Sequence, residues 1–111
     1  MDDTAELSRP AEGSYAVIFT SLRRRGEDDN YAQTADRLRL LASQQPGFLG
    51  MESVRDASGM GITVSYWKDR ASIEAWRNHT EHAEARARGR QQWYERYSVS
   101  ICKIEKEYGT P

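Results

Sequence analysis

Residues 48–67 read FLGMESVRDASGMGITVSYW, and this stretch decides the fold of the 111-residue chain. Phe48–Arg55 and Gly61–Trp67 contain the aromatic and β-branched residues that favour strands. Between them, Asp56–Gly59 is typical of a turn, because glycine tolerates a positive φ and aspartate can cap the turn locally. The centre of the chain is therefore predicted to be two strands joined by a turn.

A strand and a helix are predicted on the N-terminal side of this pair. Tyr15–Leu22 is rich in β-branched and aromatic residues. Its apolar side chains fall on both faces, so we expect cover on both faces of that strand. Helical spacing of apolar residues then predicts a helix that runs through Gln44 and is stopped by Pro46-Gly47. The residues with this spacing are Tyr31, Ala35, Leu38, and Leu41 or Ala42.

A second helix and a last strand are predicted on the C-terminal side. Asp69 is a candidate N-cap, and residues that favour helix extend over Ile73–Trp93, with a bend at Gly89. Tyr97–Tyr108 is the last predicted strand. We expect its cysteine, Cys102, to act as a small buried hydrophobe and not as a nucleophile.

The predicted order is strand, helix, strand, strand, helix, strand, which is the split βαβ or ferredoxin-like plan of the α+β class. Two helices cover one face of a four-stranded antiparallel sheet in this plan. The other face would carry apolar residues on the first and last strands, and a large exposed apolar patch is unusual in a monomer. We therefore predict a homodimer whose sheets pack face to face. The domain is expected to span residues 14–108, between a mobile N-terminal tail (1–13) and a short C-terminal tail (109–111).

The amino-acid composition limits the classes of function that are expected for this protein. Sixteen basic and seventeen acidic residues give a net charge of −1, so nothing indicates a nucleic-acid partner. No apolar run approaches the ~20 residues of a membrane span, and the acidic start lacks the features of a signal peptide. A cytoplasmic protein without a membrane partner is the expectation. The single cysteine excludes an internal disulfide and a cysteine-cluster metal site.

The predicted second helix carries the candidate site. Residues expected on one of its faces are Trp76, His79, Ala83 and Arg86, with Arg90 and Trp93 continuing that face. A tryptophan can stack on a flat ligand, a histidine can move a proton near neutral pH, and an arginine can hold a carboxylate or enolate oxygen. The alternative is structural: Trp76 belongs to the core, and His79 and Arg86 lie at the solvent edge.

A metal site is not predicted. His79 and His82 are three residues apart, whereas the zincin motif places its two histidines four apart on one helix face. A third protein ligand would also have to come from elsewhere.

Four motifs stand out in the sequence: QPGFLG (45–50), SYWKD (65–69), IEAWRNH (73–79) and GRQQWYERY (89–97). With these motifs the chain resembles the antibiotic biosynthesis monooxygenase family, and in particular a branch grouped with heme-degrading monooxygenases. The similarity covers about residues 14–108. It implies a dimeric α+β barrel with a ligand pocket in each protomer.

The resemblance also implies two possible chemistries. Heme-degrading members use a helix tryptophan and a histidine ten residues later, where this chain has Trp76 and Arg86. Cofactor-free members that oxidise phenols use a tryptophan at the end of the third strand, matched here by Trp67. Their two accompanying residues, an asparagine and a tyrosine, are replaced by Thr63 and Ile73.

The leading hypothesis is a monooxygenase that oxidises an aromatic or polyketide-like small molecule in a pocket between sheet and helices, without a cofactor. His79 or His82 would be the base and Arg86 the cation, with Arg86 at the mouth because a buried guanidinium needs a paired acid. Substrate would contact Trp67, Trp76 and Trp93. The alternatives are a heme-binding or heme-degrading protein and a non-catalytic ligand-binding dimer.

Overall fold

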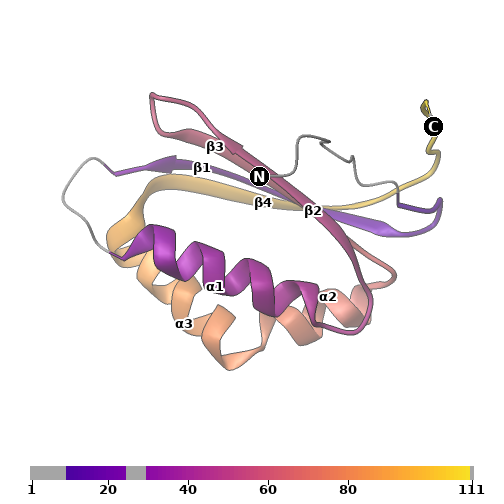
Figure 1. The fold of residues 1–111 in the computed structure, drawn as a ribbon, viewed down its shortest axis with the longest axis horizontal. Helices are drawn as coiled ribbons and strands as arrows, with labels where there is room; N and C mark the ends of the chain where they lie inside the picture. The colour runs from indigo at the N-terminus through magenta and orange to yellow at the C-terminus, as the bar shows by residue number, and fades with distance from the viewer. Residues whose placement is uncertain (1–9, 25–29, 111) are drawn as a thin grey trace.

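A computed structural model describes residues 10–24 and 30–110, and within them the chain forms a four-stranded antiparallel sheet and three α-helices (Figure 1). The strand order is β2-β3-β1-β4. This arrangement confirms the predicted ferredoxin-like split βαβ plan. The elements are β1 (Tyr15–Arg23), α1 (Tyr31–Ser43), β2 (Phe48–Arg55), β3 (Met60–Trp67), α2 (Arg70–Arg77), α3 (Thr80–Arg88), the π-helical turn η1 (Gly89–Trp93) and β4 (Tyr94–Lys103).

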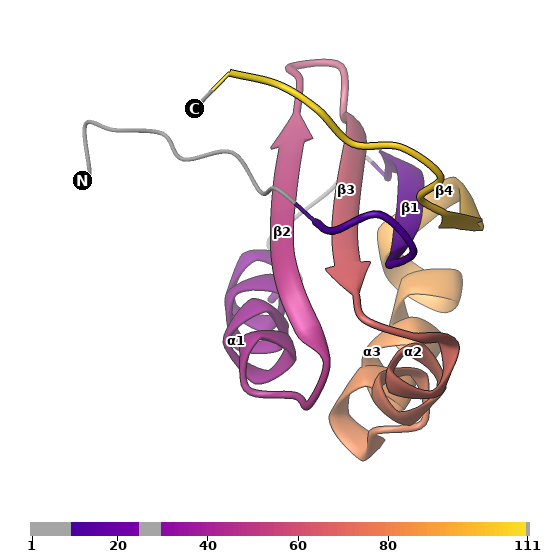
Figure 2. The same cartoon turned by 90° about the vertical axis from the view of Figure 1, so that its right-hand side faces the viewer.

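The helices form one layer on one side of the sheet (Figures 1 and 2). Buried residues of both layers meet in a core cluster that consists of Ala42, Trp67, Ile73 and Trp76. Gly47, between α1 and β2, has a φ of +86°, and a Cβ there would lie 2.1 Å from Ser72 Oγ. Glycine is therefore required at the turn that brings α1 against α2 and the sheet.

The N-cap of α2 is the one predicted. Asp69 Oδ1 accepts hydrogen bonds from the backbone N–H of Ser72 at 2.8 Å and from its hydroxyl at 2.7 Å. These bonds lower the pKa of Asp69, since they favour the carboxylate. The cap fixes where α2 starts, one turn before the buried Ile73 and Trp76.

The prediction of a single continuous second helix is wrong, and the difference changes where the site residues lie. We expected one helix over Ile73–Trp93 with a bend at Gly89, but the break comes at Asn78 and His79. His79 is extended, with φ −59° and ψ 132°, and it caps α3. Gly89 keeps helical angles, and the chain continues through it into the wide turn of η1. Trp76 and Arg86 therefore lie on two helices and not on one face of a single helix.

The last strand is also shifted from its predicted position. It spans Tyr94–Lys103 instead of Tyr97–Tyr108, because η1 ends at Trp93 and the chain passes directly into the sheet. Cys102 is exposed, contrary to the expectation of burial. It lies on the edge strand, on the face that no described helix covers.

Strand register corrects the prediction for the uncovered face. Val99 and Ile101 of β4 pair with Phe19 and Val17, and all four line the helix side of the sheet. The predicted contribution of β1 to the uncovered face is confirmed, with Ile18 and Leu22. The other large aliphatic residues there come from β3 and include Ile62 and Val64.

The predicted N-terminal tail lies mostly outside the described residues. Of its described part, Gly13 donates a backbone hydrogen bond to the Ile104 carbonyl at 2.8 Å. No helix in the described ranges is both long enough and apolar enough to cross a membrane.

Candidate functional site

A cavity of about 330 Å³ lies between the sheet and the helix layer. All four strands of the sheet form one wall, and helices α1, α2, α3 and the turn η1 form the other. Most of its lining is apolar or aromatic, as is usual for small-molecule sites. Its aromatic side chains include Phe19, Trp67, Trp76, Trp93, Tyr94 and Tyr97.

Trp67 anchors the cavity at the end of β3. Its side chain is fully buried, and its indole N–H donates a hydrogen bond to Ser65 Oγ at 2.9 Å. The Trp67 ring is stacked with the Trp76 ring at a centroid distance of 6.4 Å and an interplanar angle of 24°. Trp76 is only 8% exposed, as predicted. The two indoles form a rigid aromatic surface where sheet and α2 meet.

His82 of α3 continues this surface. Its ring is stacked on Trp76 at 4.4 Å and 12°. Its Nδ1 lies 3.0 Å from the Trp76 carbonyl, so that Nδ1–H donates and Nε2 keeps the lone pair. Burial lowers the pKa of His82 to about 4, helped by the neighbouring charges of Arg86, His79 and Arg77 and opposed by the hydrogen bond to Trp76. The imidazole is therefore neutral at neutral pH, and its free Nε2 can accept a hydrogen bond; the low pKa makes it a weak base until an anion forms beside it.

Arg86 lies beside the C-terminal end of α2. Its Nη2 donates to the Arg77 carbonyl at 3.1 Å, which the helix break at His79 makes possible. Its Nε is buried and has no hydrogen-bond partner among the described residues. Burial lowers the pKa of Arg86, and Arg77 and Arg90 lower it further. The guanidinium is thus next to the Trp76 end of the cavity with part of its donor capacity unused.

The two remaining predicted site residues are His79, which contacts this group from outside the cavity, and Trp93, which lies apart from it. The His79 ring packs against Trp76 at 5.5 Å, but His79 is not among the described residues that line the cavity. Trp93 lines the cavity from η1, is 3% exposed, and makes an edge-to-face contact with Tyr31 at 5.5 Å. The structure therefore brings Trp67, Trp76, His82 and Arg86 together and places Trp93 with Tyr31.

A tyrosine pair at that second location was not predicted. Tyr94 donates a hydrogen bond to the Tyr31 hydroxyl at 3.1 Å, and Arg55 Nη2 donates to the same oxygen at 3.1 Å. Burial raises the pKa of Tyr94, and so does its bond to Tyr31. In the sequence, Tyr31 falls at one of the positions with helical apolar spacing. This spacing does not distinguish a hydrogen-bonded tyrosine pair from an ordinary core position.

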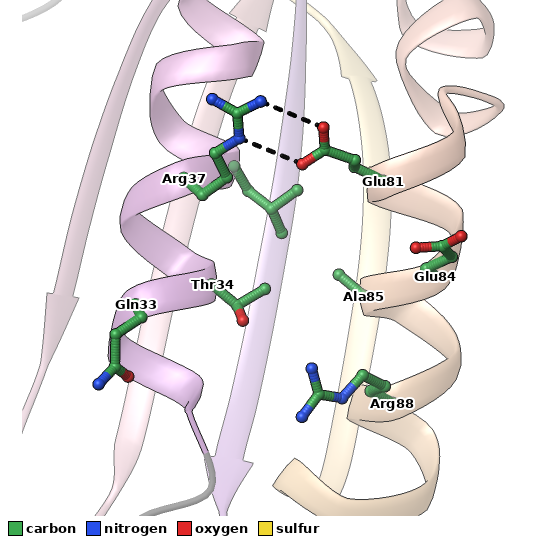
Figure 3. Close-up of a pocket in the computed structure, with 8 residues that line it drawn as sticks. Gln33, Thr34, Arg37, Glu81, Glu84, Ala85 and Arg88 are labelled. Atoms are coloured by element: carbon green, nitrogen blue, oxygen red, sulfur yellow. Dashed lines mark hydrogen bonds and ion pairs between the residues drawn. The ribbon is translucent and has the colours of Figure 1, made fainter.

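A separate groove of about 250 Å³ runs on the outside, between α1 and α3 (Figure 3). Arg37 of α1 and Glu81 of α3 bridge it through two hydrogen bonds of 3.2 Å. Both side chains are about half exposed, so the ion pair contributes little to stability. Leu38 and Ala85 line both this groove and the inner cavity.

The described residues contain no cluster of three or more histidine, cysteine, aspartate or glutamate side chains that could hold a metal ion.

Comparison with known proteins places this fold and cavity in a family. Residues 14–88 match the antibiotic biosynthesis monooxygenase family, and the chain belongs to that family. It is 50% identical over 98 residues to the uncharacterised protein YqjZ of Bacillus subtilis, a match that covers 88% of this chain and 85% of the relative.

Two further relatives have names that include an activity. The chain is 29% identical over 94 residues to a jasmonate monooxygenase of Pyricularia oryzae, across 81% of this chain but only 43% of that protein. The crystal structure of a variant of SnoaB, a cofactor-independent oxygenase of Streptomyces nogalater, superposes with a TM-score of 0.71. That superposition covers 85% of this chain and 95% of SnoaB at 10% identity, so it shows the fold alone.

Proposed function

We propose that this protein is a monooxygenase that oxidises a small aromatic molecule in the inner cavity without a cofactor. The observation that carries the proposal is the stack of Trp67, Trp76 and His82 in a cavity of about 330 Å³. Flat surfaces of this kind bind aromatic rings by offset stacking. The adjacent free Nε2 of His82 supplies a base.

His82 and Arg86 have different roles in the proposed reaction. His82 Nε2 takes the proton of a phenolic hydroxyl, which makes the ring electron-rich enough to react with dioxygen. Arg86 holds the resulting anion through charge-assisted hydrogen bonds. The ring then loses the hydroxyl hydrogen and one ring hydrogen and gains one oxygen atom. The second oxygen atom leaves as water with those two hydrogens, and the product is a quinone.

Several facts support a compact substrate and no cofactor. SnoaB, which shares the fold, is a cofactor-independent oxygenase. The cavity lies near the lower end of the range for ligand sites, about 300–1,000 Å³, which favours a compact molecule over a macrocycle. The residues do not fit heme well, because His82 is pressed against Trp76 at 4.4 Å and Arg86 stands at the position of the heme-degrading histidine.

Oxygen uptake tests this proposal. The protein is given hydroxynaphthalenes and anthrones under ¹⁸O₂, and we expect uptake with one ¹⁸O atom in the product. His82→Ala should lower kcat by about 10²- to 10⁴-fold, the usual contribution of a general base. His79→Gln is the matched control, since His79 contacts Trp76 from outside the cavity. No uptake with any phenol, or equal activity in His82→Ala, would overturn the proposal.

A hemin titration addresses the cofactor directly. We expect the absorption spectrum of free hemin to stay unchanged at tens of micromolar protein. A shifted Soret band that disappears in His82→Ala would contradict the cofactor-free reaction and would favour the heme alternative.

The same proposal includes a homodimer through the uncovered sheet face. Ile62 and Val54 on that face are 43% and 72% exposed, and Ile18 and Val64 lie beside them. A second copy on this face would bury the patch in an isologous contact.

Light scattering after size exclusion checks the dimer. At micromolar concentration we expect a mass about twice the 12.7 kDa of one chain. Val64→Glu should give a monomer, because it places a charge in the centre of the interface. Gln91→Glu, on the exposed part of η1, should leave the dimer intact. A monomeric unmodified protein would disprove this interface.

A further inference from the structure

The charged side chains that line the inner cavity are all of one sign. Among the described lining residues there are four arginines and no aspartate or glutamate; the arginines are Arg39, Arg77, Arg86 and Arg90. The chain as a whole has one more acidic than basic residue, so this cluster does not reflect a general excess of positive charge. The cavity is therefore locally cationic in a nearly neutral protein.

Counter-charges for these arginines are scarce among the described residues. The described residues offer none of the four an ion-pair partner within 4 Å, and the ion pair of Arg37 with Glu81 lies in the outer groove. Glu74 is near enough to favour the charged form of Arg86, but burial, Arg77 and Arg90 outweigh it, and the pKa of Arg86 is lowered. A guanidinium in this position is stabilised when an anion binds beside it.

Hydrogen bonding leads to the same conclusion. Arg86 Nε is buried without a partner among the described residues, whereas the three Ser and Thr hydroxyls of the cavity wall take part in hydrogen bonds. Ser53 and Thr63 bond each other at 2.7 Å, and Ser65 accepts from Trp67. The unused donor at this end of the cavity therefore belongs to an arginine.

From this arrangement we infer that the substrate is an apolar cyclic molecule that carries a carboxylate, with its ring among the aromatic side chains of the cavity and its carboxylate on Arg86. The planar carboxylate matches one guanidinium, which can donate two parallel hydrogen bonds to it. Arg39, Arg77 and Arg90 are exposed and attract the anion to the mouth. This inference rests on the proposed function for the site but concerns binding, so it can be tested without turnover.

Titration calorimetry with 2-naphthoic acid, its methyl ester and 2-naphthyl phosphate tests the inference. We expect the acid to bind about ten- to a hundred-fold more tightly than the ester, in line with a hydrogen-bonded charge pair. Arg86→Gln should lower the affinity for the acid to that for the ester and leave the ester unchanged. Arg37→Gln removes the same charge from the outer groove and should change neither affinity.

The outcomes separate this inference from the oxygenase proposal. Equal affinity for acid and ester, or acid selectivity that survives in Arg86→Gln, would overturn the carboxylate assignment even if phenols are oxidised. Tighter binding of the phosphate than of the acid would replace the carboxylate by a phosphate. Selective binding of the acid with no oxygen uptake would leave the inference standing and remove the oxygenase proposal.

Discussion

Trp76→Ala is expected to lower the free energy of unfolding by about 3–5 kcal/mol, the usual cost of deleting a buried large aromatic side chain. Trp76 is 8% exposed and is stacked between Trp67 and His82. The truncation therefore removes three ring contacts, with Trp67, His79 and His82, and enlarges a cavity that already exists. Neighbouring side chains cannot collapse into it without leaving their own contacts. Urea unfolding monitored by far-UV circular dichroism measures the effect.

Tyr108→Ala is the matched control for this loss. Tyr108 is an aromatic residue of the same chain that is 82% exposed, so its truncation should change stability by less than about 0.5 kcal/mol. A Trp76→Ala protein as stable as the Tyr108→Ala protein would mean that the two stacks do not hold α2 and α3 against the sheet.

Lowering the pH should destabilise the folded protein by favouring protonation of His82, at pH values where most carboxylates are still ionised. The folded-state pKa is lowered to about 4, whereas an unfolded histidine has a pKa near 6.5. Between these two values the unfolded chain binds a proton that the folded chain does not bind. Stability therefore falls as the pH falls from about 6.5 to about 4, by roughly 2–3 kcal/mol from this residue.

His82→Gln isolates the contribution of His82 from the other titrating groups. Glutamine can still donate to the Trp76 carbonyl but does not titrate. We expect the difference in unfolding free energy between the two proteins to shift in favour of the variant as the pH is lowered from 7 to 4. Parallel stability curves over that range would show that folding does not lower the pKa of His82.

The fold could be predicted because its signals are local. Each boundary has its own signal: the turn at Asp56–Gly59, the cap at Asp69 and the helical spacing before Pro46. The resulting order of strands and helices is that of the split βαβ plan. The break at His79 has only a weak signal. Asn78 can end a helix, and His79 and Thr80 have low helix propensity, but no glycine or proline marks the boundary.

The site could be predicted only in part, for the same reason. Trp76 is identified by its residue type, but its stack with His82 depends on the direction that α3 takes after the break. The spacing of one continuous helix gave His79 and Arg86 a common face, whereas the observed break places His82 on the Trp76 ring instead. The arginine lining comes from α1, α2, α3 and η1, and such a gathering is a property of tertiary structure that no motif encodes.

Leu38 and Ala85, which line both the inner cavity and the outer groove, make the boundary between these spaces thin. Leucine side chains change rotamer on fast timescales, and Ala85 offers little bulk to close a gap. Each of these two side chains therefore forms part of both walls, so a change of side-chain size at Leu38 or Ala85 would alter the inner cavity and the outer groove together.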